Sequence, residues 1–186
     1  MLTLSCSRRS ISSQSVWLAV VSVCLLVTLP HSAVGEGRID TLVTQGDLFQ
    51  LGPGTFVNFS RIRLNDSGDF SFTSFLTCTT GGSADDLGIY LIPFGGGATE
   101  LAREGGTAPD GNGTYGSITN LGLNEVGESF YFSFFNGTSG GVSDNTGLTR
   151  NSGGASTTIA REGDLVPGGN GEYGNFSSST SIYSFN

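Results

Sequence analysis

Histidine, lysine and tryptophan are almost missing from this chain. Its 186 residues include one histidine and one tryptophan; His31 and Trp17 both lie near the N-terminus, and there is no lysine. Without an imidazole, the remainder cannot build a Ser-His-Asp or Cys-His relay, and it lacks a usual ligand of zinc and non-haem iron. The absence of lysine excludes a Schiff base and a P-loop.

Cysteine and positive charge are also scarce. Cys6 and Cys24 lie in the N-terminal segment, which leaves Cys78 alone in the remainder. A lone cysteine cannot form an internal disulfide, so we expect packing to supply the stability and Cys78 to be a small core or loop residue. Eight basic residues face 16 acidic ones, for a net charge of −8. That charge repels a phosphate backbone and argues against a nucleic-acid partner.

The N-terminal segment has the pattern of a secretory signal peptide. An apolar run over residues 16–29 follows a pair of arginines and precedes the small residues Ala33-Val34-Gly35. The run is too short for a membrane span, and the small residues suit a signal-peptidase site. We therefore predict a signal peptide over residues 1–35 and one domain over 36–186, secreted to the periplasm or the cell surface.

The rest of the sequence repeats itself. Three segments align, with their first glycines, Gly46, Gly105 and Gly163, 59 and 58 residues apart. An Asn-x-x-Gly motif recurs with the same spacing. We predict units at about 41–99 and 100–157, with a partial unit at 158–186. The recurring positions that we assign to the scaffold are Asn65, Gly68, Asn124, Gly127, Arg103, Glu104, Gly105, Arg161, Glu162 and Gly163.

Within each unit the apolar pattern alternates as in a β-strand. Phe130, Phe132 and Phe134 fall on one face of a predicted strand, and Tyr131 and Phe135 on the other. No stretch after the signal peptide has helical periodicity, and the 30 glycines argue against helices. We predict an all-β fold of tandem four-stranded antiparallel units of about 59 residues.

Two architectures fit such units. Each unit resembles a propeller blade, and the alternative is a β-sandwich made by duplication. Two and a half units are too few for a propeller, which needs at least about four blades. Three possibilities follow. Other copies in a homo-oligomer complete the β assembly, the two units close on each other, or the reading frame is a fragment.

The same motifs resemble a known family of secreted bacterial tandem-repeat proteins of the choice-of-anchor type. Its Asn-x-x-Gly-x-x-Ala-Phe signature is matched by Asn65–Phe72, with Ser71 for alanine, and more loosely by Asn124–Tyr131. Its Arg-Glu-Gly-Asp-x-x-Pro-Gly segment is matched by Arg161–Gly168 and in part by Arg103–Asp110. The resemblance implies an extracytoplasmic β-repeat domain, a surface anchor in longer members, and no catalytic residues.

Calcium is the only cofactor for which the sequence offers ligands. The oxygen-bearing candidates are Asn65, Asp66, Asp69, Asp85 and Asp86. Their spacing is not that of an EF-hand, and Asn-x-x-Gly between strands is a typical turn. We therefore expect turn structure and no cofactor, with calcium as the alternative.

The Arg-Glu pairs at 103–104 and 161–162 allow a structural and a catalytic interpretation. Paired carboxylates can hydrolyse glycosides, but the first unit carries Thr44-Gln45 at these positions. Arginine and glutamate are absent together, as expected if they form an ion pair across strands between neighbouring units. Asp85-Asp86 is the one conspicuous acid pair that the second unit lacks.

The sequence does not identify an activity. We expect a secreted, non-enzymatic β-repeat module with a structural or interaction role at a surface or in the extracellular matrix. Glycans or surface proteins would be its partners, bound by the glycine-rich loops 77–86, 107–114 and 136–146. Two alternatives stay open: a carbohydrate-active enzyme that uses only carboxylates, and a truncated, non-functional fragment of a longer repeat protein.

Overall fold

The computed structural model describes residues 41–49 and 52–177 of the chain. The predicted signal peptide lies outside these residues. Among the described residues, no helix has the length and apolar character needed to span a membrane.

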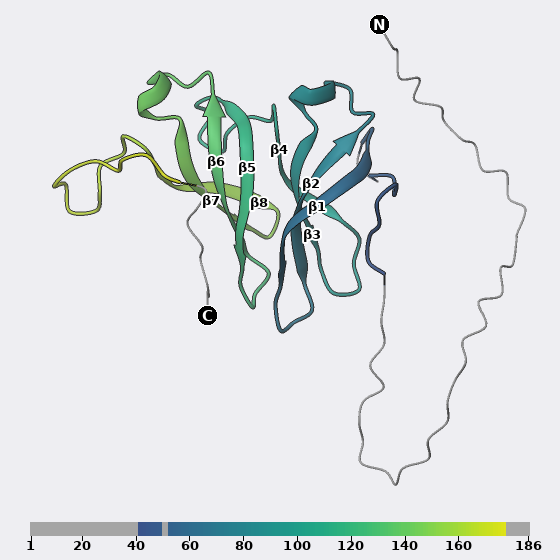
Figure 1. The fold of residues 1–186 in the computed structure, drawn as a ribbon. Coiled ribbons are helices and arrows are strands. Elements are labelled where there is room, and N and C mark those ends of the chain that lie inside the picture. Colours follow the sequence, from purple (N-terminus) through teal and green to yellow (C-terminus); the bar gives the residue numbers. More distant parts are fainter. Residues whose placement is uncertain (1–40, 50–51, 178–186) are drawn as a thin grey trace, which may run out of the picture. The chain divides into compact units, whose positions relative to one another are not determined.

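Eight antiparallel strands form two sheets (Figure 1). Sheet one contains β1 (Thr55–Leu64), β2 (Phe70–Thr77), β3 (Leu87–Ile92) and β4 (Thr99–Arg103). Sheet two contains β5 (Thr114–Leu123), β6 (Ser129–Asn136), β7 (Thr146–Ser152) and β8 (Ala155–Arg161). The only helices in the described part are two short 3₁₀ turns, η1 (Gly82–Ala84) and η2 (Gly141–Ser143). The prediction of an all-β fold with four-stranded antiparallel units is confirmed.

The two sheets are built alike, strand by strand. Each runs in sequence order from edge to edge, and each carries its 3₁₀ turn between its second and third strands. The loop that precedes each sheet is closed by the same bond, from Gly46 N to Phe56 O at 2.8 Å and from Gly105 N to Tyr115 O at 2.7 Å. The third aligned segment forms this loop again, from Gly163 N to Tyr173 O at 2.9 Å.

Each central strand is covered on both faces, as the alternating aromatics predict. On β6, Tyr131 and Phe135 are fully buried on one face, while Phe132 is buried on the other. On β3, Ile89 and Tyr90 are neighbours with no exposed surface at all, although they point to opposite sides of sheet one. A strand can bury both faces only if something lies over each side of its sheet.

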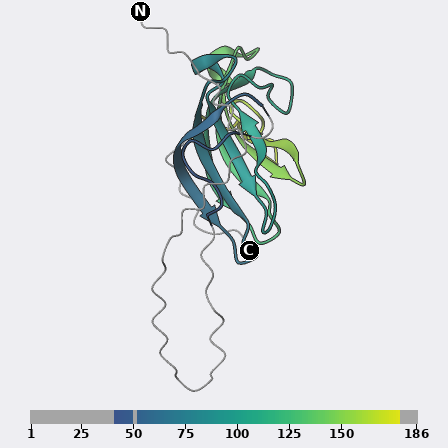
Figure 2. The same cartoon turned by 90° about the vertical axis from the view of Figure 1, so that its right-hand side faces the viewer.

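Unlike faces of the two sheets meet. We call the front face of sheet one the side with Phe56, Phe72 and Tyr90, which pack in one apolar cluster, and the back face the side with Ile89. The front face of sheet two carries the equivalent Tyr115 and Tyr131, and these pack with Ile89 in the other cluster. The front of sheet two therefore lies on the back of sheet one. Figures 1 and 2 show the two sheets next to each other.

This stacking decides only in part between a propeller-like assembly and a duplicated β-sandwich. In a sandwich that places two like faces together, the aromatic front faces would meet, and they do not. Within the described residues the strands also form two open sheets, and no closed barrel or propeller is present. The front face of sheet one is instead covered by the segment before β1, from which Val43 and Phe49 pack into its cluster.

Cys78 lies in the loop after β2, as the sequence predicted for a core or loop residue, and it is exposed. It is also disulfide-bonded, which the sequence analysis did not expect. The other two cysteines of the chain, Cys6 and Cys24, lie outside the described residues.

Packing on the front face of sheet one supplies a first test. Phe72 has 0% exposure among four other aromatic rings, whereas Phe75 on the same strand is 45% exposed. We expect Phe72→Ala to lower the free energy of unfolding by about 3–5 kcal/mol, because it opens a cavity. Phe75→Ala should cost less than about 1 kcal/mol. Urea denaturation measures both, and equal losses would contradict the described faces.

Candidate functional site

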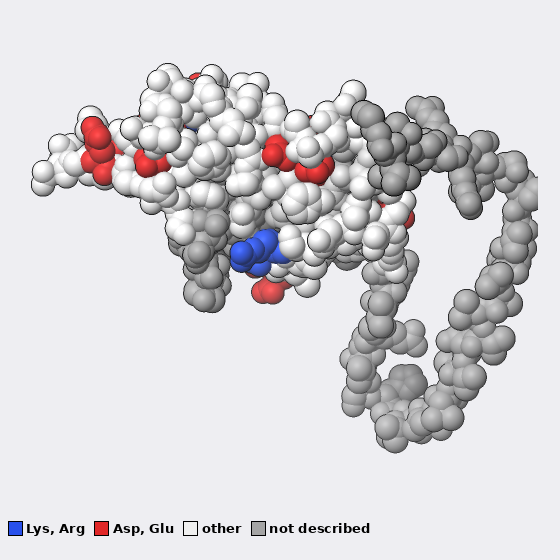
Figure 3. Space-filling view, turned by 45° about the horizontal axis from the view of Figure 1, so that its top comes forward, with Lys and Arg blue, Asp and Glu red and all other residues white. Residues whose placement is uncertain are grey.

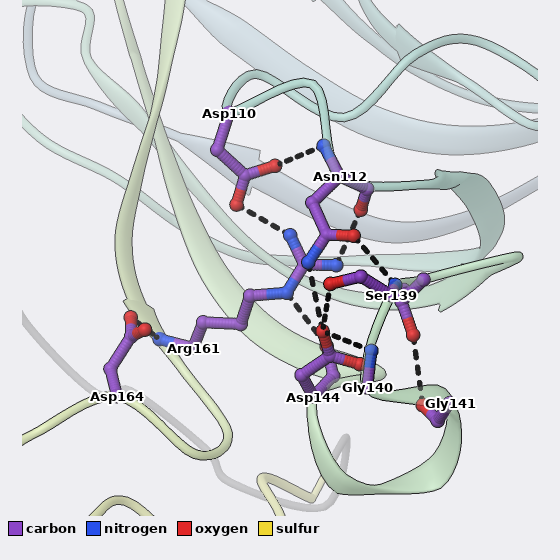
Figure 4. Close-up of polar contacts among 9 residues, drawn as sticks. Asp110, Asn112, Ser139, Gly140, Gly141, Asp144, Arg161 and Asp164 are labelled. Atoms are coloured by element: carbon purple, nitrogen blue, oxygen red, sulfur yellow. Dashed lines mark hydrogen bonds and ion pairs between the residues drawn. The ribbon is translucent and has the colours of Figure 1, made fainter.

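The most elaborate polar arrangement in the described residues surrounds Arg161, the last residue of β8 (Figure 4). Its side chain reaches into the loop that precedes β5 and the loop that precedes β7. Nε donates to the Asp144 carbonyl oxygen at 2.6 Å, and Nη2 donates to that of Asn112 at 2.6 Å. Nη1 forms an ion pair with the Asp110 carboxylate. Each guanidinium nitrogen therefore has a partner in the protein.

Further contacts lock these loops around the guanidinium. Asn112 donates from its side-chain amide to the Asp144 carboxylate at 2.8 Å and accepts from Ser139 N at 2.8 Å. The guanidinium carbon lies 4.3 Å from the centre of the Phe135 ring. We call Arg161, Asp110, Asn112 and Asp144 the arginine clamp. With Arg161 only 3% exposed, its charge is directed at protein atoms and not at solvent.

Arg103 occupies the equivalent place on β4 but has fewer partners. Its Nε donates to the Asp85 carbonyl oxygen at 2.7 Å, the counterpart of the bond from Arg161 to Asp144. Its Nη1 lies 3.3 Å from the Glu100 carboxylate on the same strand. The buried Nη2 has no hydrogen-bond partner. By sequence equivalence, Leu51 and Pro53 stand where sheet two has Asp110 and Asn112, and neither side chain can accept a hydrogen bond.

We expected arginine to form an ion pair with the motif glutamate, and the predicted partner is wrong. Arg161 does reach back to the preceding unit, but it pairs with Asp110 and not with Glu104 or Glu162. The Glu162 carboxylate accepts a hydrogen bond from the Thr146 hydroxyl at 2.9 Å. Asp110 and Asn112 lie in the loop 107–114, which was predicted only as a binding loop. Nothing in their spacing from Arg161 reveals the contact, because three separate loops have to fold before they meet.

Asp85, a candidate calcium ligand and a candidate catalytic residue, is bonded within the loop that contains η1. A hydrogen bond from Thr79, together with Gly81 N and the charge of Arg103, holds the pKa of Asp85 below its ordinary value. Asp144 has the same role in the loop of η2, where Thr138, Asn112 and Gly140 N lower its pKa. Asp85 is therefore not peculiar to the first unit, which removes one argument for a catalytic role.

Asp86 and Glu104 form the one carboxyl pair that the second unit lacks. Burial raises the pKa of Glu104 above its ordinary value, and the charge and hydrogen bond of Asp86 raise it further. Two carboxyl groups within hydrogen-bonding range of each other are closer than glycoside hydrolysis uses. That reaction needs about 5–5.5 Å for retention and about 6.5–9.5 Å for inversion.

The remaining calcium candidates belong to a turn. Asn65 accepts from Asp69 N at 2.8 Å through Oδ1, and its amide donates to the Asp69 carboxylate at 3.0 Å. The same amide donates to the Asn124 carbonyl oxygen at 2.8 Å, and Asp66 N donates to the Glu125 carboxylate at 2.9 Å. The Asn-x-x-Gly turns of the two sheets are thus bonded to each other.

No calcium site follows from this arrangement. The turn of Asn65 and Asp69 lies at the start of β2, whereas Asp85 and Asp86 follow the end of that strand, so the candidates are not brought together. In the part of the chain that the structure describes, no three His, Cys, Asp or Glu side chains gather as metal ligands.

The arginine clamp gives a second test. We expect Arg161→Ala to cost about 3–5 kcal/mol of unfolding free energy, because it leaves the partly buried Asp110 carboxylate without its counter-charge. Arg150→Ala, an exposed arginine on β7, should cost no more than about 0.5 kcal/mol. Chemical denaturation compares the two variants. Equal stability would show that the clamp holds nothing together.

The carboxyl pair gives a third test, through pH. Because the folded-state pKa of Glu104 is raised, its ionised carboxylate opposes folding at neutral pH, and this contribution is lost as the pH falls through the raised pKa toward the ordinary value of 4.5. Glu104→Gln should therefore raise the melting temperature at pH 7 and lose that advantage near pH 4. Glu162→Gln, which keeps an acceptor for Thr146, is the matched control. A gain that is independent of pH would contradict the assignment.

Comparison with known proteins gives a family but no activity. The model of a family described as of unknown function, DUF7453, matches residues 30–185. No curated protein and no solved structure matches the chain. The chain belongs to the family of unknown function DUF7453.

Proposed function

We propose that the chain is a secreted, non-enzymatic β-repeat module with a structural or interaction role at a cell surface or in the extracellular matrix. The observation that carries the proposal is the arginine clamp. Arginine and aspartate are the residues of the repeat that most suggest catalysis. In the clamp they bond instead to backbone and side-chain atoms of neighbouring loops. Arg161 and Asp144 recur as Arg103 and Asp85 and make the same bond within the protein, which suits a scaffold better than a reaction centre.

The loops held by the clamp supply the interaction surface. The loops with η1 and η2 lie at the same end of the two sheets (Figure 1), and Asn112 bonds the loop before β5 to the loop with η2. The surface that Figure 3 turns toward the viewer is largely uncharged, with separate acidic groups and a basic group. Small polar residues on loops fixed by Asp85 and Asp144 would present a rigid pattern to a glycan or a surface protein.

The sequence supports the location and the family type. The predicted signal peptide favours export, and the resemblance to choice-of-anchor repeat proteins favours an extracytoplasmic β-repeat domain. A carbohydrate-active enzyme is the second candidate, because Asp86 and Glu104 are a pair that only the first sheet holds. Their direct contact disfavours it.

The two functions can be separated by one set of variants. Ser83 in η1 and Val142 in η2 are exposed at equivalent positions, and Val126 is exposed in the turn at the opposite end. On a glycan array and on intact cells, we expect Ser83→Arg and Val142→Arg to weaken binding at least about tenfold. Val126→Arg should leave binding unchanged, and all three should keep the parent melting temperature.

An enzyme would behave differently. Hydrolysis in a glycosidase panel that is lost in Asp86→Asn and in Glu104→Gln, with unchanged melting temperature, would overturn the proposal. Binding that survives both loop variants but fails in Val126→Arg would move the interaction surface to the other end of the sheets.

A further inference from the structure

Three asparagines of the described residues, Asn112, Asn136 and Asn170, stand directly before a glycine. In such a pair the glycine nitrogen can attack the carboxamide carbon of the asparagine, because glycine has no Cβ to obstruct the approach. The new C–N bond closes a succinimide ring as ammonia leaves, and water then opens the ring to aspartate or isoaspartate. Each event replaces a neutral amide by a carboxylate, so the three positions are candidate sites of spontaneous deamidation.

Asn112 and Asn170 occupy the same place in two equivalent loops. They are separated by the same number of residues as Gly105 and Gly163. The tip of each loop is closed by the same backbone bond of 3.0 Å, from Ala108 N to Gly113 O and from Val166 N to Gly171 O. Because the two loops are closed alike, a difference in reactivity has to come from what surrounds each side chain.

The arginine clamp holds both the side chain and the backbone of Asn112 (Figure 4). The carboxamide donates to the Asp144 carboxylate at 2.8 Å and accepts from Ser139 N at 2.8 Å. The carbonyl oxygen of the same residue accepts from Arg161 Nη2 at 2.6 Å. To meet the Gly113 nitrogen, the carboxamide would have to leave both of its partners, and breaking these bonds costs free energy.

Asn170 has none of these partners. The residue is exposed, and its carboxamide makes no hydrogen bond to a described residue. By sequence equivalence, Gly168 stands where the clamped loop has Asp110. The side chain of Asn170 can therefore rotate toward the Gly171 nitrogen without breaking a hydrogen bond.

Asn136 lies between these two cases. It is the last residue of β6 and pairs with Thr114 across sheet two, so its backbone is held in the strand. A Cβ placed on Gly116 would lie 2.8 Å from Asn136 Nδ2, which shows that the carboxamide rests against β5. The residue is exposed, however, and its side chain is not tied to other loops as that of Asn112 is.

We propose that Asn170 is a site of spontaneous deamidation and that the arginine clamp protects Asn112 from the same reaction. Deamidation of Asn112 would place a second carboxylate where an amide now donates to Asp144, and so replace an attraction by a repulsion. The clamp thus preserves a residue on which it depends. The reaction needs only water, so the inference is independent of any ligand bound at the loop end.

Peptide mapping by mass spectrometry, after incubation of the folded full chain in mildly alkaline buffer, measures each site separately. We expect Asn170 to react at least about tenfold faster than Asn112, because Asn112 must first be released by local opening of the clamp. Asn136 should react at a rate between the two. In concentrated urea the three sites should react at similar rates, because the fold then no longer distinguishes them.

Two aspartate variants separate the clamp from overall stability. Asp144→Ala removes the acceptor of the Asn112 carboxamide and should speed deamidation of Asn112 about fivefold, without changing the rate at Asn170. Asp85→Ala removes the equivalent aspartate from the loop with η1 and should leave all three rates unchanged. Of the two variants that imitate the product, Asn112→Asp should lower the melting temperature and Asn170→Asp should not.

Three results would overturn the proposal. Equal rates at Asn112 and Asn170 in the folded chain would show that the clamp protects nothing. An unmodified Asn170 in the folded chain, with reaction in urea, would show that this exposed loop is itself protected. Equal acceleration of Asn112 by Asp144→Ala and Asp85→Ala would assign the protection to global stability and not to the clamp.

Discussion

The structure depends on one contact, the packing of an aromatic front face onto an aliphatic back face. Tyr115, Tyr131 and Phe135 of sheet two fill the surface formed by Leu87 and Ile89 of sheet one. Neither sheet could bury both of its faces alone, because its own loops can cover only one side of it. The absence of a long helix in the described residues leaves sheet-on-sheet burial as the main source of stability.

Polar contacts make this layering specific at both ends of the sheets. At one end, Asn65 and Asp66 bond to Asn124 and Glu125, so that equivalent turns of the two sheets meet. At the other end, Arg161 closes on the loops before β5 and β7. Buried polar groups are costly unless paired, so a register that broke these bonds would be disfavoured. The recurring motifs therefore serve the architecture.

The sequence predicted the strands well because their signals are local. Alternation of Phe130 to Phe135 depends only on residues near one another in the chain, and the step between Gly46, Gly105 and Gly163 is visible when the sequence is compared with itself. The turn at Asn65 was likewise predictable, since asparagine and glycine favour the backbone angles that it needs; Gly68 has a φ of 86°.

The long-range contacts could not be predicted from the sequence. Which face of sheet two meets which face of sheet one is set by the path of the loop before β5, and both faces carry aromatics. The partner of Arg161 was mispredicted for the same reason, because its carboxylate, Asp110, lies on a loop that only the completed fold brings near. Asp144 is recognisable in the sequence as the equivalent of Asp85, although its bond to Arg161 is not. The pairing of Asp86 with Glu104 could not, since it joins the loop before β3 to the end of β4.

The stacking of unlike faces can be measured most directly by nuclear Overhauser effects in the folded chain. Ile89 methyl groups should give cross-peaks to the rings of Tyr115 and Tyr131, and Tyr90 should give cross-peaks to Phe56 and Phe49. Cross-peaks that instead connect Tyr131 with Phe72 or Tyr90 would show that the two aromatic front faces meet, and would contradict the account.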